Sequence, residues 1–210
     1  MKRAVIFDMD GVISDTHDMI VSSELKQLNA YGLELTADFI SDTYAGYSDK
    51  DFFADLINRF GINASVEKLI EEKWQNMKEF SDQIKEIDGA TDLIKLLHAN
   101  GFKMTVGSGS PKNFINLVIE KLNLGNYFEY LISSEEVERG KPHPDVFLKG
   151  AELIGFEPNL CTVIEDGKNG MIAAKTCGMR CIGIVKDLNK EYPADKLVKS
   201  LRELTLEDFI

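Results

Sequence analysis

Five short apolar runs, separated by segments with helical periodicity, constrain the fold of this 210-residue chain more than any other feature. Each run is short and apolar enough to be covered on both faces, which is typical of strands in a parallel sheet. The alternation of such runs with helices predicts a doubly wound α/β fold. The predicted strands are residues 4–7, 103–106, 130–133, 161–164 and 181–185. Glycines fall where the predicted helices should end, at Gly101, Gly125, Gly155 and Gly178.

Residues 16–84 interrupt this alternation, because they show helical periodicity without an apolar run typical of a parallel strand. One apolar helical face, for example, contains Phe53 and Leu56. The insertion leaves and returns at one edge of the predicted sheet, so it can hinge over the carboxyl ends of the strands. We therefore expect a core domain of residues 1–15 and 85–210, and a helical cap domain of residues 16–84.

The chain carries a net charge of −11 at neutral pH, which repels nucleic acids and anionic membrane surfaces. We therefore expect neither nucleic acid nor membrane as a partner. The first apolar run ends at Asp8, too early for a signal peptide, and no segment reaches the roughly 18 apolar residues of a membrane-spanning helix. We expect a cytoplasmic protein that is a monomer or a weak dimer.

Neither the cysteines nor the histidines have the spacing of a zinc site. Three residues separate Cys177 from Cys181, where a zinc motif usually has two, and the histidines do not pair one helical turn apart. We expect Cys161, Cys177 and Cys181 to be buried, reduced thiols.

The first predicted strand leads into Asp8-Met9-Asp10-Gly11, which places two carboxylates where the chain leaves the sheet. In open α/β folds this edge is the general ligand-binding position. Like charges this close raise each other's pKa unless a cation or hydrogen bonds relieve the repulsion. A small set of carboxylate oxygens suits Mg²⁺, which keeps several of its waters. The motif therefore predicts a magnesium site, with a solvated turn as the alternative explanation.

Three later segments place matching groups at predicted strand ends or in a loop. Glu165 and Asp166 follow an apolar run, and Asp166 can complete a metal shell. Ser108 and Gly109 follow another run and offer a hydroxyl and backbone N–H groups to phosphate oxygens. Lys141 supplies a cation that can neutralise both a nucleophile and a bound phosphate. Taken singly, each feature also has an ordinary explanation, such as a turn or a solvated charge.

Together, in this order, the four segments resemble the haloacid dehalogenase superfamily of phosphohydrolases, and specifically its β-phosphoglucomutase-like, sugar-phosphatase branch. The resemblance covers nearly the whole chain, and residues 16–84 correspond in place and helical character to the cap of that family. One departure is Gly167, where the family usually has a serine. The motifs that carry the resemblance are Asp8-Met9-Asp10-Gly11-Val12, Ser108, Lys141 and Glu165-Asp166.

The resemblance implies a two-step hydrolysis of a small phosphorylated metabolite, with Asp8 as the nucleophile. Asp10 is implied to protonate the leaving oxygen and later to activate water. Asp8, the backbone carbonyl of Asp10 and Asp166 are implied to hold Mg²⁺, with Glu165 behind them or acting through water.

Ser108, the Gly109 amide and Lys141 are implied to bind the transferring phosphoryl group, whose charge requires positioning and neutralisation. Residues 108–113 also look like the corresponding run of sugar-phosphate and sugar-acid-phosphate phosphatases. A helix start with solvated lysines is the alternative for part of this run. The residues expected to bind the rest of the substrate are Lys50, Ser110, Lys112, Asn113 and His17.

Within the family, the second acid of the first motif disfavours dehalogenases and phosphonoacetaldehyde hydrolases. A β-phosphoglucomutase-type mutase is the alternative, because Gly46-Tyr47-Ser48 resembles the mutase cap loop. That loop continues with Arg, whereas this chain has Asp49, whose charge is expected to repel a second phosphate. Ile20 also stands where the mutase cap has a His, although Lys50 and His17 could substitute by geometry. Hydrolysis of a sugar phosphate or sugar-acid phosphate is therefore the prediction.

A non-enzymatic alternative is a receiver-like α/β module, in which a strand-end aspartate only accepts phosphate. The insertion of residues 16–84 argues against this alternative, because receiver domains are much shorter and have no lid. A closing cap is what a hydrolase uses to control the access of water.

Overall fold

The structure is a computed structural model that describes residues 3–44 and 49–210. Three residues in these ranges are described by their backbone alone, namely His17, Ser41 and Asp42. The chain forms two compact units, which we call the core unit and the helical unit. The core unit is Met1–Asp15 with Lys85–Ile210, and the helical unit is Thr16–Ile84.

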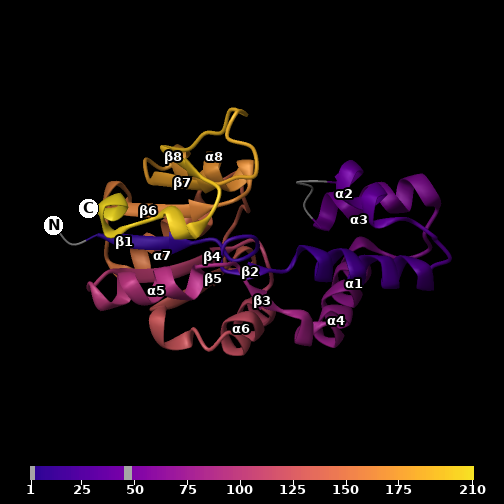
Figure 1. Cartoon of the computed structure of the whole chain (residues 1–210). Coiled ribbons are helices and arrows are strands. Elements are labelled where there is room, and N and C mark those ends of the chain that lie inside the picture. Colours follow the sequence, from indigo (N-terminus) through magenta and orange to yellow (C-terminus); the bar gives the residue numbers. More distant parts are fainter. Residues whose placement is uncertain (1–2, 45–48) are drawn as a thin grey trace. The chain divides into compact units, whose positions relative to one another are not determined.

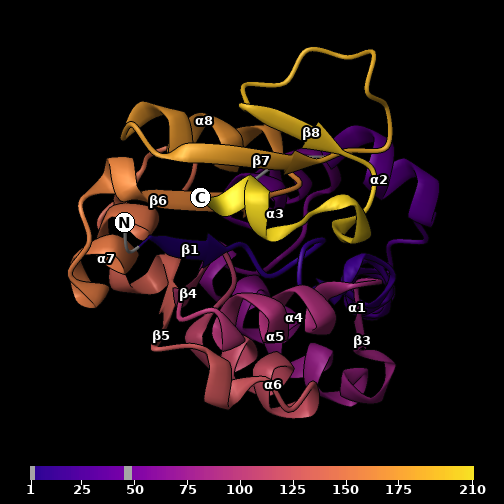
Figure 2. The ribbon, with the colours of Figure 1, turned by 60° about the vertical axis from the view of Figure 1, so that its left-hand side comes forward.

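A six-stranded parallel sheet forms the centre of the core unit (Figures 1 and 2). Across the sheet the order is β5-β4-β1-β6-β7-β8, so the connection from β5 to β6 carries the chain back past β1. Ligands in such sheets bind at the carboxyl ends of the strands, beside this reversal. The predicted doubly wound α/β fold is confirmed. The strands are β1 (Ala4–Phe7), β4 (Lys103–Ser108), β5 (Tyr130–Ser133), β6 (Cys161–Glu165), β7 (Arg180–Ile184) and β8 (Lys196–Val198).

The edge strand β8 was not indicated by the apolar runs. It pairs with β7 through only three residues, and of these Val198 alone is buried. A strand this short at a sheet edge buries too little to leave a recognisable pattern in the sequence.

Side chains of the central strand β1 are buried on both faces of the sheet. Ala4 and Ile6 belong to a buried cluster that also contains residues of α7 and α8. Val5 and Phe7 point to the opposite face because side chains alternate along a strand, and the Phe7 ring packs edge to face on Phe128 with centroids 5.7 Å apart. Burial on both faces explains why these strands read as continuous apolar runs. The helices of the core unit are α5 (Ala90–Ala99), α6 (Lys112–Lys121), α7 (Asp145–Ile154) and α8 (Lys168–Thr176).

Two short antiparallel strands lie where the chain leaves and re-enters the core unit. Strand β2 (Ser14–Asp15) pairs with β3 (Lys85–Glu86), so the two ends of the insertion are held together. Short 3-10 turns complete the chain at η1 (Ser81–Gln83), η2 (Gly125–Tyr127), η3 (Ser134–Glu136), η4 (Pro158–Leu160), η5 (Leu201–Glu203) and η6 (Leu206–Phe209).

In its described residues, the helical unit packs four helices around an apolar core of its own. Leu28, Phe53, Leu56 and Leu69 are fully buried in this core. Each comes from a helix with apolar residues three and four positions apart, so the periodicity of the sequence is the cause of the packing. The helices are α1 (His17–Ala30), α2 (Ala37–Tyr44), α3 (Asp49–Phe60) and α4 (Val66–Glu79).

A cluster of charged side chains lies inside the helical unit. Lys73 Nζ is 2.9 Å from Glu24 Oε1 and 2.5 Å from Asp49 Oδ1. The Lys73 side chain is only 5% exposed and that of Glu24 only 8%. Burial by itself lowers the pKa of Lys73, but the charges of Asp49 and Glu24 raise it on balance, so the lysine stays charged.

Among the residues that the structure describes, no helix combines the length and the apolar character needed to cross a bilayer.

Candidate active site

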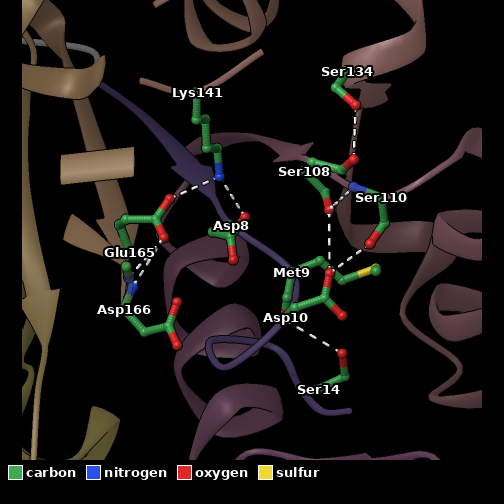
Figure 3. A network of polar contacts seen from close by, with 12 residues as sticks. Asp8, Met9, Asp10, Ser14, Ser108, Ser110, Ser134, Lys141, Glu165 and Asp166 are labelled. Atoms are coloured by element: carbon green, nitrogen blue, oxygen red, sulfur yellow. Dashed lines mark hydrogen bonds and ion pairs between the residues drawn. The ribbon is translucent and has the colours of Figure 1, made fainter. Parts of the chain in front are cut away.

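The candidate site lies at the carboxyl ends of β1, β4 and β6. The register pairs Phe7 of β1 with Val106 of β4 and with Ile164 of β6. Asp8 continues β1 by donating its backbone N–H to the Ile164 carbonyl at 2.9 Å. Because the three strands run parallel, the polar residues that follow them gather at one edge. Figure 3 shows the residues that meet there, namely Asp8, Asp10, Ser108, Ser110, Lys141, Glu165 and Asp166.

Lys141 joins the buried side chains of Asp8 and Glu165. Its Nζ lies 2.5 Å from Asp8 Oδ1 and 2.7 Å from Glu165 Oε2, and none of the three side chains is more than 12% exposed. Burial, and then the charge of Glu165, raises the pKa of Asp8 well above its usual value, while Lys141 opposes the rise. Burial acts to lower the pKa of Lys141, but Asp8 and Glu165 raise it on balance. Lys141 is therefore charged at neutral pH.

Asp166 adds a third carboxylate next to Asp8 and Glu165. One oxygen of each carboxylate lies within 4.8 Å of the others. Partial loss of hydration, and then the charge of Glu165, raises the pKa of Asp166 to about 7, although this residue keeps contact with solvent. Lys141 balances only part of the negative charge of the cluster. The donor set therefore fits Mg²⁺, which binds through one or a few carboxylates and retains waters.

Glu165 has partners within the protein at both of its oxygens. Oε2 contacts Lys141, and Oε1 accepts the backbone N–H groups of Asp166 at 3.2 Å and Gly167 at 3.0 Å. Gly170 of α8 makes room for this side chain, because a Cβ at that position would lie 1.8 Å from Glu165 Oε2. Gly170 is not among the site residues predicted from the sequence. The available signal was a glycine inside a predicted helix, where glycine is unfavourable.

Gly11 occupies a turn that strongly favours glycine. Its φ is +78°, in the left-handed region, and a Cβ would lie 2.1 Å from Asp166 Oδ2. The loop after β1 therefore comes as close to Asp166 as it does because Gly11 has no side chain.

Asp10 is oriented by serines at the end of β4. Ser110 Oγ donates to Asp10 Oδ2 at 2.7 Å, and Ser108 Oγ lies 3.4 Å from the same oxygen. Ser108 Oγ also accepts the backbone N–H of Ser110 at 3.0 Å. These contacts fix the carboxylate of Asp10 relative to the loop that follows β4 (Figure 3).

Three of the residues predicted to bind the rest of the substrate belong to the core unit. Ser110 is part of the Asp10 network described above. Lys112 is already paired, because its Nζ lies 2.9 Å from Glu136 Oε2 and its backbone N–H donates to Glu135 Oε2 at 2.9 Å. Asn113 is exposed in the first turn of α6. Of these three, Ser110 is the one with a hydrogen bond to a carboxylate of the candidate site, that of Asp10.

The other two predicted substrate residues belong to the helical unit. Lys50 is exposed at the second position of α3. His17 is the first residue of α1, and its side chain lies outside the described part of the structure. The predicted cap loop Gly46-Tyr47-Ser48 also lies outside the described residues.

The arrangement supplies the groups needed for covalent transfer of an anionic group. Asp8 presents a carboxylate beside an ammonium group and can act as a nucleophile, and Asp10 is a second acid that can exchange a proton. Ser108 places a hydroxyl next to this pair. A tetrahedral anion bound between these residues would meet a nucleophile, an acid and hydrogen-bond donors.

This chain matches the model of a known protein family. The family model described as haloacid dehalogenase-like hydrolase matches residues 5–184. The matched residues run from β1 to the end of β7, so they contain every residue of the candidate site.

Several relatives resemble the chain over most of their length. The phosphorylated carbohydrates phosphatase of Thermotoga maritima is 29% identical over 189 residues, which cover 89% of this chain and 87% of that protein. Hexitol phosphatase B of Escherichia coli is 27% identical over 213 aligned residues, which cover 99% of this chain and 96% of that protein. The crystal structure of a β-phosphoglucomutase from Clostridium difficile has a TM-score of 0.85 at 26% identity, covering 99% of this chain and 95% of that chain.

Proposed function

This chain belongs to the haloacid dehalogenase-like hydrolase family, and from that premise we propose that it is a magnesium-dependent phosphatase that hydrolyses a small phosphorylated carbohydrate through Asp8. A phosphatase is supported by the family and by relatives named as phosphatases. The observation that carries the rest of the proposal is the buried Asp8 carboxylate, 2.5 Å from the Lys141 ammonium and grouped with two further carboxylates.

In the first step, a carboxylate oxygen of Asp8 attacks phosphorus and the bond from phosphorus to the ester oxygen breaks. Asp10 gives its proton to that oxygen, so the alcohol leaves in its neutral form. In the second step, Asp10 takes a proton from water as the water oxygen attacks phosphorus. The bond between phosphorus and Asp8 then breaks, which releases inorganic phosphate and restores both aspartates. The Ser110 hydroxyl keeps Asp10 oriented through these exchanges.

Ser108, the backbone N–H of Gly109 and Lys141 bind the oxygens of the transferring phosphoryl group and stabilise their negative charge. A Cβ built on Gly109 would meet no atom within 4 Å, so the space beside this backbone is open. Lys141 neutralises Asp8 before the attack, and its charge remains available to the phosphoryl oxygens afterwards. Phosphoryl transfer depends mainly on such positioning and electrostatic stabilisation.

We assign Asp8, Asp166 and the backbone carbonyl of Asp10 as the groups that hold Mg²⁺. Support comes from the raised pKa values of Asp8 and Asp166, which indicate carboxylates short of positive charge. Glu165 remains paired with Lys141 and supports the metal ligands without binding the metal directly. When bound, Mg²⁺ supplies positive charge that keeps Asp8 ionised and stabilises the phosphoryl oxygens.

We further propose that the helical unit acts as a cap that contributes to substrate selection. Lys50 is its candidate contact, because this ammonium is exposed at the start of α3. A phosphorylated carbohydrate suits such a contact, since its hydroxyl groups accept hydrogen bonds from an ammonium. The relatives named for phosphorylated carbohydrates and for hexitols support this substrate class.

A sugar phosphomutase is the second candidate, favoured by the similarity to a β-phosphoglucomutase along the whole chain. Two residues disfavour a mutase, namely Asp49 through its negative charge and Ile20 in place of a His. The Asp49 carboxylate lies 2.5 Å from Lys73 Nζ, so its charge is partly neutralised and disfavours a mutase less. Incubation with glucose 1-phosphate isomers separates the two activities. Isomerisation faster than release of inorganic phosphate would support the mutase.

The test of the proposal is turnover of p-nitrophenyl phosphate with and without Mg²⁺, followed by a panel of phosphorylated sugars, polyols and sugar acids. We expect many turnovers per protein molecule, dependent on Mg²⁺ and suppressed by EDTA. Hydrolysis that survives thorough removal of metal would overturn the metal assignment. A single phosphorylation per molecule without turnover would support the receiver-like alternative.

A further inference from the structure

We infer that Ser134 is a positioning residue that fixes the peptide between Gly109 and Ser110 and so directs the hydroxyl of Ser108 at the phosphoryl group. The inference rests on the proposed function, because it assigns a further residue to the same site. Ser134 is the first residue of η3, directly after β5, and it has no contact with Asp8 or Asp10 in the network of Figure 3.

The peptide that joins Gly109 to Ser110 is held at both of its polar atoms. Ser134 Oγ donates to the Gly109 carbonyl at 2.7 Å, and the Ser110 N–H donates to Ser108 Oγ at 3.0 Å. A trans peptide is planar, with its C=O and N–H pointing in opposite directions. Anchoring the carbonyl on Ser134 therefore sets the direction of the N–H that meets Ser108 (Figure 3).

The following peptide is anchored from the same side. Ser133 Oγ, which is fully buried, donates to the Ser110 carbonyl at 2.7 Å. The nitrogen of this peptide belongs to Pro111, which has no N–H, so the carbonyl is its hydrogen-bonding group. Two consecutive carbonyls of the loop that follows β4, those of Gly109 and Ser110, are thus hydrogen-bonded to serines at the end of β5. The loop cannot rotate either peptide without losing one of these bonds.

These anchored peptides determine where the hydroxyl proton of Ser108 points. Its oxygen accepts the Ser110 N–H, which leaves the hydroxyl proton to point away from the loop backbone. The contact from this hydroxyl to Asp10 Oδ2 is long, at 3.4 Å. A phosphoryl oxygen at the usual O–H···O distance of about 2.7 Å would be the stronger acceptor. Hydrogen bonds in series also polarise one another, so the bond from Ser134 strengthens Ser108 as a donor.

The same geometry indicates that Ser134 contributes little to folding. Ser134 is partly exposed, and its bond to the Gly109 carbonyl lies at the surface. Water can satisfy that carbonyl once the hydroxyl is removed, so no buried group is left without a partner. Loss of Ser134 should therefore affect the reaction more than the stability of the protein.

The test is a double-mutant cycle on kcat/KM for p-nitrophenyl phosphate at saturating Mg²⁺. Ser134→Ala should lower kcat/KM by about three- to tenfold in the wild-type background, the range for one neutral hydrogen bond. In a Ser108→Ala background the same change should have an effect below about twofold, because the group it acts through is absent. Ser134→Thr keeps the hydroxyl and should retain most of the activity.

Two further measurements separate positioning from a general structural defect. The inhibition constant of inorganic phosphate should rise with Ser134→Ala, also by about three- to tenfold, while the melting temperature stays close to that of the wild type. Ser200→Ala is the matched control, because it removes another partly exposed serine of the core unit, whose Oγ accepts the Arg202 N–H at 3.2 Å. Equal losses from Ser134→Ala with and without Ser108, or no loss at all, would overturn the inference alone. A wild-type protein without phosphatase activity would overturn the proposed function as well.

Discussion

Replacing Gly170 by Ala should disable the site without touching any group that meets the substrate. The added Cβ would lie 1.8 Å from Glu165 Oε2 and 2.2 Å from its Cδ, distances that no real contact allows. The Glu165 side chain must therefore swing away from α8. Because Oε2 is also the atom that contacts Lys141 at 2.7 Å, this movement breaks the ion pair that holds the lysine.

The expected loss follows from the bond that is broken. A hydrogen bond between charged groups contributes about 1.5–3 kcal/mol, which corresponds to a fall in kcat/KM of about 10- to 150-fold. The free energy of unfolding should change by less than this. Overpacking costs about 1–3 kcal/mol, but replacing glycine by alanine inside a helix regains about 1 kcal/mol. The assay is steady-state hydrolysis of an aryl phosphate at saturating Mg²⁺, together with a thermal melt.

Two variants make this prediction specific. Gly125→Ala is the matched control, since a Cβ at Gly125 meets no atom within 4 Å and should leave activity unchanged. Glu165→Ala removes the displaced carboxylate, so Gly170→Ala should cause little further loss in that background. If Gly170→Ala is as active as Gly125→Ala, the role assigned to the contact between Glu165 and Lys141 is wrong.

The remaining predictions concern the metal, the cap and the helical unit. Asp166→Ala should raise the Mg²⁺ concentration for half-maximal activity by about tenfold or more, and an unchanged metal requirement would exclude Asp166 as a ligand. Lys50→Ala should lower kcat/KM for a good sugar phosphate by about 10- to 100-fold but barely affect p-nitrophenyl phosphate. Equal losses for both substrates would refute the cap contact. Lys73→Met should destabilise the helical unit by about 3 kcal/mol, since it leaves Glu24 and Asp49 unpaired. Urea unfolding followed by the fluorescence of the single tryptophan measures this, and an unchanged midpoint would contradict it.

The strands of the sheet could be predicted from sequence because most of them are buried on both faces. Such burial requires a continuous apolar run, and each of the five runs forms a strand. The edge strand β8 could not be predicted in this way, because it is short and mostly half-exposed. After α6, Asn123 rather than the predicted Gly125 adopts the left-handed conformation, with φ of 56°. Asparagine tolerates this region better than most residues, so composition alone does not reveal the turn.

The grouping of the acidic motifs at one edge followed from the parallel topology, because Asp8, Ser108 and Glu165 each end or follow a strand. The parts that sequence could not supply depend on distances between segments far apart in the chain. Gly170 is needed because of where Glu165 lies, and Ser134 because of where the Gly109 carbonyl points. A glycine inside a helix is only a weak signal for the first relation, and no local pattern indicates the second.

The central claim is that Asp8 is the nucleophile, and steady-state turnover of Asp8→Asn tests it most directly. The amide is a poor nucleophile, so we predict a loss of at least about a thousandfold. The melting temperature and circular dichroism spectrum should show that the variant is folded. Near-normal hydrolysis by a folded Asp8→Asn protein would contradict the account.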